Sequence, residues 1–507
     1  MSRTANTLKN LKTATIGQAL GMLISFVSRK VFVMMLPTEY LGLSGLFTNI
    51  LSILALSELG FGTAIVYSLY KPLAENDYEK IKSLMRLFKR VYTAIGVFIL
   101  VVGVSLTPFL SFFINDMPDI PDSLSVIYIL YVVNSAASYF FIYKRSLIIA
   151  DQKRYIATIY RYGLFVVLNL AQIIALLLTR NFYLYLLLQI GNTILENVLL
   201  SIKADKLFPY LKEKDVKPLD KGVVTEIKKY VFAMMCHKLG GVVVNGTSNL
   251  LISKLVSLIA VGLYSNYMLV INALNSVMGL IFQSITASFG NLSAEADNQK
   301  KEDVFNTINF GTFWISGVCS VVLAVMFEPF IAVWLGKEYL CGMWVVLIIV
   351  LNFYLRTMRQ SVLMTRDAMG LFWYDRYKPI FESVVNLVAA IILGKHYGIV
   401  GVLSGACIST LLVNLWVEPW VLYKYGFKSK LRRYFKDYAI YFAQTVICLL
   451  ITYFVASFIE ANNFLWLIVK GFATVIVCNL VFVIFNLKSK HIRTYMDIVL
   501  NMIGRRK

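Results

Sequence analysis

The chain has 507 residues and a formal net charge of +21, but only 15% of its residues are charged and 58% are hydrophobic. Soluble domains carry about 25% charged residues, and the mean hydropathy here is +0.70. Composition therefore argues against a soluble protein. Because Lys and Arg accumulate in the cytoplasmic loops of membrane proteins, we expect the basicity to reflect topology, and we expect no nucleic-acid partner.

Apolar runs long enough to cross a bilayer, about 20 residues each, recur along the whole chain. They predict an all-α polytopic membrane protein with about fourteen transmembrane helices. In the first half the predicted spans are 14–36, 41–68, 91–114, 123–143, 160–179 and 182–201. In the second half they are 230–252, 256–288, 306–333, 342–364, 379–396, 398–423, 438–459 and 464–486.

The loops between these spans differ in their content of Lys and Arg. With the N-terminus inside, the basic loops all fall inside: Lys71–Arg90, Lys144–Arg161, Lys203–Lys229, Lys424–Lys436 and Lys488–Lys507. The outer loops are short and poor in Lys and Arg. This bias predicts that both termini are cytoplasmic. The first span follows no small-residue cleavage site, so we expect no removable signal peptide.

The longest charged loop divides the predicted spans into six and eight. We therefore expect two six-helix lobes around a central cavity, followed by two extra C-terminal helices. The predicted parts are an N-terminal lobe (1–201), a cytoplasmic linker (202–229), a C-terminal lobe (230–423), a cytoplasmic loop (424–437), two spans (438–486) and a cytoplasmic tail (487–507).

Polar residues recur on one helical face in the first span of each predicted lobe. They are Gln18, Ser25 and Arg29 in the first span, and Lys238, Asn245 and Asn249 in the seventh. Steps of seven and four residues stack side chains on one face. Matching polar stripes in two lobes are typical of transporters built from repeats around a hydrated cavity. For Ser, Gln and Asn, interhelical hydrogen bonding is an equal alternative.

Arg29 is the leading candidate for the cavity, because a guanidinium inside a span needs an anion or water. His237 and Lys238 lie early in their span, so snorkelling to the cytoplasmic face competes with cavity lining. Glu58 is open to three interpretations: an ion pair with Arg29, a site for a coupling cation, or a structural hydrogen bond.

Other charged residues in the spans point to packing or snorkelling. For Arg356 and Arg359, near the cytoplasmic end of their span, we favour a packing role. We expect Lys30 and Lys470 to snorkel, and we assign Glu196 no function. Cationic residues outnumber acidic ones in the spans expected to line the cavity. Since Arg suits bidentate phosphate binding, this excess favours an anionic substrate.

Recognisable enzyme and cofactor motifs are missing. The sequence contains no phosphate-binding loop, dinucleotide fingerprint, zinc-protease motif or nucleophile elbow. The six cysteines are scattered and form no Cys-x-x-Cys pair, so neither a disulfide framework nor a metal site is indicated. We expect a protein that is not an enzyme and has no cofactor, with a coupling ion left open.

Eight segments along nearly the whole chain resemble Wzx-type polysaccharide flippases of the multidrug/oligosaccharidyl-lipid/polysaccharide exporter superfamily. In the first half these are 3–10 (RTANTLKN), 39–52 (EYLGLSGLFTNILS), 57–65 (SELGFGTAI), 68–77 (SLYKPLAEND) and 150–155 (ADQKRY). In the second half they are 237–245 (HKLGGVVVN), 264–267 (YSNY) and 288–292 (SFGNL). Ser248 departs from the family, whose members often carry an acidic residue there.

The resemblance implies two six-helix lobes in a V and a cationic central cavity. It also implies movement of undecaprenyl-diphosphate-linked oligosaccharide from the inner to the outer leaflet of a bacterial cytoplasmic membrane, by alternating access. Arg29 and then Lys238 would be the diphosphate ligands. A polysaccharide polymerase and glycosyltransferases would be the protein partners, in capsule or exopolysaccharide synthesis.

Two other functions stay open. A cation-coupled multidrug exporter of the same superfamily would need acidic cavity residues, of which Glu58 is the main candidate. A membrane polysaccharide polymerase or ligase would need a sizeable outer loop, and the outer loops here are short. A scaffold without transport activity is disfavoured by the polar stripes.

Overall fold

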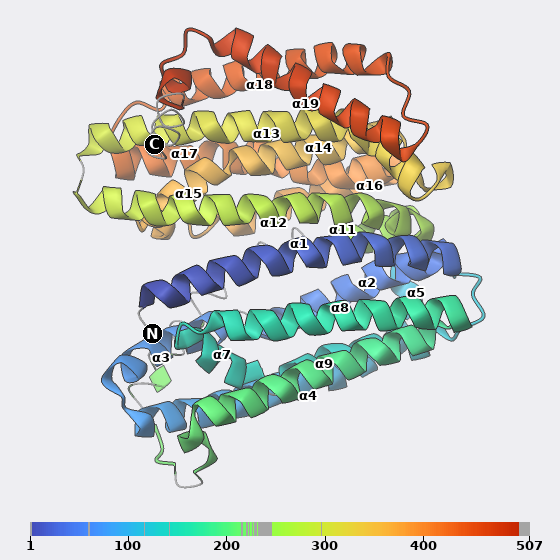
Figure 1. The fold of residues 1–507 in the computed structure, drawn as a ribbon, viewed down its shortest axis with the longest axis vertical. Coiled ribbons are helices and arrows are strands. Elements are labelled where there is room, and N and C mark those ends of the chain that lie inside the picture. Colours follow the sequence, from blue (N-terminus) through green and yellow to red (C-terminus); the bar gives the residue numbers. More distant parts are fainter. Residues whose placement is uncertain are drawn as a thin grey trace. The chain divides into compact units, whose positions relative to one another are not determined.

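The computed structural model describes residues 3–58, 61–115, 117–140, 142–213, 216–219, 222, 224–225, 227, 231, 246–295 and 297–495. Within these residues every regular element is a helix (Figure 1). The chain forms two compact units, Met1–Gly262 (unit 1) and Leu263–Lys507 (unit 2). It is an all-α polytopic membrane protein, as its composition predicts. Helix α12 (Leu258–Glu295) begins in unit 1 and continues into unit 2.

Ten of the described helices are long and apolar enough to cross a membrane, or eleven if the bent pair α6 and α7 forms one span. One of the ten is a 50-residue stretch, Lys378–Phe427, that covers two predicted spans. The predicted span 41–68 is made of shorter helices, and the predicted span 230–252 lies mostly outside the described residues. The number fourteen therefore stays a prediction.

Unit 1 is built mainly from long helices that run along one another (Figure 1). The long helices are α1 (Arg3–Met35), α4 (Tyr78–Ser105), α8 (Arg154–Thr179) and α9 (Phe182–Leu207). The shorter elements are α2 (Thr38–Leu54), η1 (Ala55–Glu58), α3 (Phe61–Glu75), η2 (Thr107–Phe109), α5 (Leu110–Phe113), α6 (Leu124–Tyr139), α7 (Ile142–Ala150), η3 (Pro209–Lys212) and α11 (Ser248–Leu255).

Local sequence explains where several of these helices begin. The side chain of Asp77 accepts a hydrogen bond from the backbone N–H of Lys80 (3.0 Å) at the start of α4, and Asn181 caps α9 in the same way through Leu184 (3.0 Å). Asx residues at this position satisfy backbone donors that the helix leaves unpaired. Helix α4 therefore begins well before the predicted span 91–114, and part of the expected loop Lys71–Arg90 is helical.

The chain after α9 packs on the start of α4. Ser83 donates to the carbonyl oxygen of Lys217 (2.6 Å), and Lys82 pairs with Glu213 (2.7 Å). The Tyr210 and Tyr78 rings lie 4.7 Å apart, and burial raises the pKa of Tyr210 to about 12. The first part of the predicted linker is thus an ordered element of unit 1.

Unit 2 is organised around the long helix α13 (Asn298–Trp334). Its other elements are η4 (Lys337–Tyr339), α14 (Met343–Met358), α15 (Gln360–Ala368), η5 (Leu371–Trp373), α16 (Lys378–Ser409), the π-helical turn η6 (Thr410–Asn414), α17 (Leu415–Val421), the π-helical turn η7 (Leu422–Phe427), α18 (Arg432–Ser457) and α19 (Phe464–Asn486). Asp297 and Asn463 cap α13 and α19.

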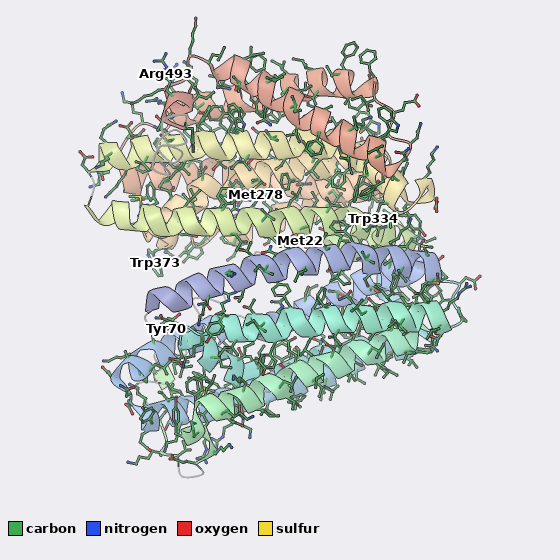
Figure 2. The ribbon with its side chains drawn as sticks, viewed as in Figure 1. Met22, Tyr70, Met278, Trp334, Trp373 and Arg493 are labelled. Atoms are coloured by element: carbon green, nitrogen blue, oxygen red, sulfur yellow. The ribbon has the colours of Figure 1, made fainter. Side chains whose placement is uncertain are left out.

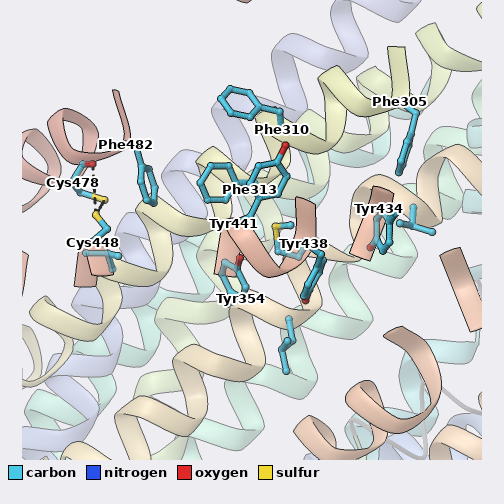
Figure 3. Packing of buried hydrophobic residues seen from close by; sticks show 14 of the residues in the cluster. Phe305, Phe310, Phe313, Tyr354, Tyr434, Tyr438, Tyr441, Cys448, Cys478 and Phe482 are labelled. Carbon is cyan, nitrogen blue, oxygen red and sulfur yellow. Dashed lines mark hydrogen bonds between the residues drawn. The ribbon is translucent and has the colours of Figure 1, made fainter. Parts of the chain in front are cut away.

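Helices α18 and α19, the predicted C-terminal addition, pack on α13 through an aromatic core (Figure 3). Phe313 of α13 stacks on Tyr441 of α18 with ring centroids 4.3 Å apart and an interplanar angle of 11°. Phe482 of α19 lies 5.1 Å from the same Phe313 ring. Aromatic pairs at these distances add stabilisation beyond their buried area, so the last two helices are an integral part of unit 2.

The chain reverses direction inside α16 at Gly398, whose φ of 57° and ψ of −133° are non-helical. The residues after it pack against the residues before it. A Cβ at Gly401 would collide with the carbonyl oxygen of Leu393, and one at Gly405 would lie 2.6 Å from that of Asn386. Two spans joined by a tight turn therefore occupy this stretch, and a Gly-x-x-x-Gly pair lets their backbones approach closely.

Candidate functional site

Helix α1 has three distinct faces. Gly17 and Gly21 pack against the Tyr162 ring of α8, where an added Cβ at Gly21 would lie 3.0 Å from the ring. A second face is apolar and exposed, with Leu23 as its most exposed member. The predicted stripe of Gln18, Ser25 and Arg29 lies nearly opposite the exposed apolar face and about 80° from the glycines, because each step along a helix turns by about 100°.

Arg29 lies among tyrosines inside unit 1. The hydroxyl groups of Tyr131 (α6) and Tyr185 (α9) are close enough to interact electrostatically with its guanidinium. The Tyr131 hydroxyl also donates to the hydroxyl of Ser44 on α2 (2.7 Å), which in turn donates to the backbone carbonyl of Tyr40 (2.7 Å). We call Arg29, Ser44, Tyr131 and Tyr185 the Arg29 site. It gathers side chains from α1, α2, α6 and α9.

A wall of aromatic rings borders the Arg29 site. Phe32, one turn after Arg29 on the same helix, packs edge-on against Phe182 (5.9 Å) and Tyr185 (5.4 Å). Phe182 also lies 4.6 Å from Tyr40. A planar fork of N–H donors suits a phosphate. Binding of an anion by Arg29 stays a prediction.

The structure places the remaining residues of the first stripe without assigning them a ligand. Ser25 donates to the backbone carbonyl of Gly21 (2.7 Å), the usual local bond of a helical serine. Gln18 is half-buried. Their role in a cavity stays a prediction.

Only one member of the second stripe can be placed. Asn249 on α11 donates to the carbonyl oxygen of Gly45 on α2 (3.4 Å), which is the kind of interhelical contact expected under the packing alternative. His237, Lys238 and Asn245 lie outside the described residues.

Glu58 lies in its own tyrosine-lined position. It accepts a hydrogen bond from the Tyr92 hydroxyl (3.4 Å) and interacts with the Tyr139 hydroxyl. Tyr139 and Tyr131 are eight residues apart on α6, which corresponds to about 12 Å along the helix axis. Glu58 and Arg29 thus have separate tyrosine partners at different depths of unit 1.

Unit 2 contains a buried charge cluster that the sequence reading missed. Arg359 makes a bidentate ion pair with Glu418 (2.6 and 3.0 Å), and Glu418 also pairs with Lys378. Glu382 lies 3.5 Å from Arg359 and accepts from the Asn414 side chain (2.6 Å). We call the stretch 378–427, which turns back at Gly398, the α16–α17 hairpin. The contacts of Arg359 join the end of α14 to both arms of this hairpin, so Arg359 has the packing role that we favoured. Acidic residues inside predicted spans were the signal available in the sequence.

Arg356, one turn before Arg359, differs from it in exposure. Its side chain is exposed, although it lies in a helix long enough to span the membrane. It interacts with the Tyr264 hydroxyl of α12 and with Glu382. These neighbours on α12 and α16 fit the packing role expected for it.

Two further charges inside predicted spans can be placed. Glu196 on α9 pairs with Arg145 of α7 (3.4 Å), and Lys470 lies near the start of α19. Among the described residues, no group of three or more His, Cys, Asp or Glu is arranged to hold a metal ion.

No protein-family model and no curated protein sequence matches the chain, but solved structures do. The lipid II flippase MurJ, in an inward closed conformation, matches with a TM-score of 0.64 at 13% identity, over 94% of this chain and 99% of that one. An inward-facing multidrug resistance MATE transporter of the MOP superfamily matches with a TM-score of 0.61 at 16% identity, over 82% and 99% of the two chains. A mutant of the Vibrio cholerae MATE transporter VcmN matches at 0.56 and 13% identity, over 85% and 99%. At such identities the likeness is one of fold, and the chain has the fold of the MurJ and MATE transporters.

Proposed function

We propose that this protein is a flippase that moves undecaprenyl-diphosphate-linked oligosaccharide repeat units from the inner to the outer leaflet by alternating access. It acts in a bacterial cytoplasmic membrane with both termini in the cytoplasm, and it performs no chemical conversion. Glycosyltransferases would supply its substrate, and a polysaccharide polymerase would consume its product for capsule or exopolysaccharide synthesis.

The observation that carries this proposal is the Arg29 site. A guanidinium inside a membrane-spanning helix, bordered by tyrosine hydroxyls and aromatic rings, is matched to a diphosphate in chemistry. A cationic drug would be repelled by it. The fold likeness to a protein named as a lipid flippase supports the same class of substrate.

A second candidate is a cation-coupled multidrug exporter. It is favoured by Glu58, which lies between the hydroxyls of Tyr92 and Tyr139, and by the fold likeness to MATE transporters. If the chain is a flippase, the same carboxylate is available to a coupling ion. The polymerase or ligase alternative gains no support, because the solved structures that this chain resembles are a lipid flippase and MATE transporters.

The Arg29 site is tested by substitution of its cation. We expect Arg29→Ala to lower translocation by about ten- to hundredfold, the effect of losing charge-assisted hydrogen bonds to a phosphate, without reducing membrane insertion. Arg29→Lys should retain part of the activity, since it keeps the charge but loses the fork of donors. Lys12→Ala, an exposed position on the same helix, is the matched control. Full activity of Arg29→Ala would remove this residue from the mechanism.

The substrate is tested in a strain that lacks the protein, by extracting undecaprenyl-linked glycans and probing which membrane face exposes them. A flippase predicts complete repeat units on the cytoplasmic face, relieved by the wild-type chain. Normal glycan export with lost resistance to cationic dyes would instead establish the drug exporter. Single unpolymerised units on the outer face would identify a polymerase.

A further inference from the structure

One end of unit 2 carries a group of exposed aromatic rings. Trp373 and Tyr377 are 62% and 60% exposed, and Trp420 is 43% exposed. Tyr374 stacks on Tyr425 with centroids 4.0 Å apart, and Tyr425 packs edge-on against Trp420 at 5.7 Å. These contacts join the turn after α15 to the end of the α16–α17 hairpin. We call Trp373, Tyr374, Tyr377, Trp420 and Tyr425 the aromatic collar.

Two cations lie on the rings of the collar. The Arg376 guanidinium is 4.3 Å from the Trp373 centroid and 4.6 Å from that of Tyr377. The Lys424 ammonium is 4.5 Å from the Trp420 centroid. In the part of the chain that the structure describes, neither cation forms an ion pair with a carboxylate. Their charge therefore remains available to an anion at the surface.

The cations just behind the collar are neutralised. Arg366 pairs with the buried Asp375, and Lys378 pairs with the buried Glu418. Asp375 lies between Tyr374 and Arg376 in the sequence, so its ion pair anchors the turn from within. The Arg376 guanidinium also donates to the backbone carbonyl of Trp373 (3.0 Å), so collar and cations form one prearranged surface.

The collar lies at the basic end of unit 2. Trp373 and Trp334 lie near opposite ends of this unit (Figure 2). The segment 424–436, which begins beside Tyr425 of the collar, is rich in cations: Lys424, Lys428, Lys430, Arg432, Arg433 and Lys436. Among the described residues, the exposed turns of the Trp334 end carry the cations Lys337 and Lys395. Under the positive-inside rule the collar faces the cytoplasmic leaflet.

We propose that the aromatic collar is a binding site for the headgroups of anionic phospholipids of the cytoplasmic leaflet. Trp and Tyr favour the depth of the headgroups, and clustered Lys and Arg beside a span attract anionic lipids. Arg376 and Lys424 contact the headgroup phosphate while the rings pack on the glycerol and upper acyl region. The proposal rests on the predicted orientation and is independent of what the protein transports.

The test uses the full chain in nanodiscs of phosphatidylcholine with a minority of phosphatidylglycerol. Either lipid is brominated near the ester end of its acyl chains, and quenching of tryptophan fluorescence is recorded. Subtracting the signal of a Trp373→Phe/Trp420→Phe variant isolates these two of the seven tryptophans. We expect their quenching to show about a fivefold or greater preference for phosphatidylglycerol at low salt.

Charge variants decide the outcome. Arg376→Gln with Lys424→Gln should abolish the preference, while Lys337→Gln with Lys395→Gln, at the other end of unit 2, should retain it. Arg376→Lys keeps the charge and should retain most of the preference for phosphatidylglycerol. This result would show that the loss of preference in the Gln variants is not due to misfolding. Equal quenching by both lipids in the wild type would overturn the proposal. So would equal losses in the two Gln pairs, or displacement of phosphatidylglycerol by a polyprenyl diphosphate at equimolar amounts.

Discussion

At the scale of single residues, Arg29 and the unit 2 cluster have different neighbours. Arg29 interacts with the hydroxyls of Tyr131 and Tyr185, and Arg359 and Lys378 pair with Glu418. A buried ion pair contributes little net stability, but removing one partner leaves an uncompensated charge. The Arg29 site is the anion site that we propose, and the unit 2 cluster is suited to hold helices together.

The prediction at this scale concerns Glu418, which is 1% exposed. Glu418→Gln should destabilise the protein by about 3 kcal/mol or more, because Arg359 and Lys378 lose their shared carboxylate. Thermal unfolding in detergent measures the effect, and the exposed Glu460→Gln is the control. Adding Lys378→Met to Glu418→Gln should recover part of the loss. Equal unfolding temperatures for Glu418→Gln and wild type would show that the cluster is not formed.

At the scale of helices, close packing depends on glycine at particular positions. Gly401 and Gly405 bring the two arms of the α16–α17 hairpin together, and Gly17 and Gly21 receive a ring of α8. A helical glycine costs about 1 kcal/mol relative to alanine in an exposed helix, so these glycines are retained for contact. The glycines thus identify which faces of these helices are buried.

Opposite effects of the same substitution test this packing. Gly401→Ala should destabilise unit 2, because the added Cβ collides with the Leu393 carbonyl oxygen. Gly191→Ala, in α9 with open space around it, should be neutral or stabilising by about 1 kcal/mol. The midpoint of thermal unfolding of each purified variant provides the measurement. A neutral Gly401→Ala would argue against the hairpin.

At the scale of the whole molecule, the distribution of Lys and Arg predicts how the chain lies in the membrane. Unit 2 alone shows the bias, since Lys430 belongs to the basic segment after Tyr425 and Lys337 stands three residues after Trp334 at the other end. The orientation decides which leaflet the aromatic collar meets.

Cysteine labelling tests the orientation directly. In a chain whose six cysteines are replaced by alanine, Lys337→Cys should react with a membrane-impermeant maleimide in intact cells. Lys430→Cys should react only after lysis, because the positive-inside rule places it in the cytoplasm. Both positions are exposed, so access alone does not separate them. The reverse pattern would invert the predicted topology.

The sequence by itself determined the class of this protein, the approximate positions of most spans and the helix that bears Arg29. Hydropathy, helical periodicity and capping are local properties and can be read from one segment at a time. It did not reveal that Tyr131 and Tyr185 border Arg29, that Glu418 joins Arg359 to Lys378, or that Trp373 and Trp420 share one surface. These groups come from segments far apart in the chain, and side-chain neighbours across helices depend on how the helices cross. Only the tertiary structure decided which side chains are neighbours, because a charged residue in a span has several acceptable partners and helix packing selects one of them.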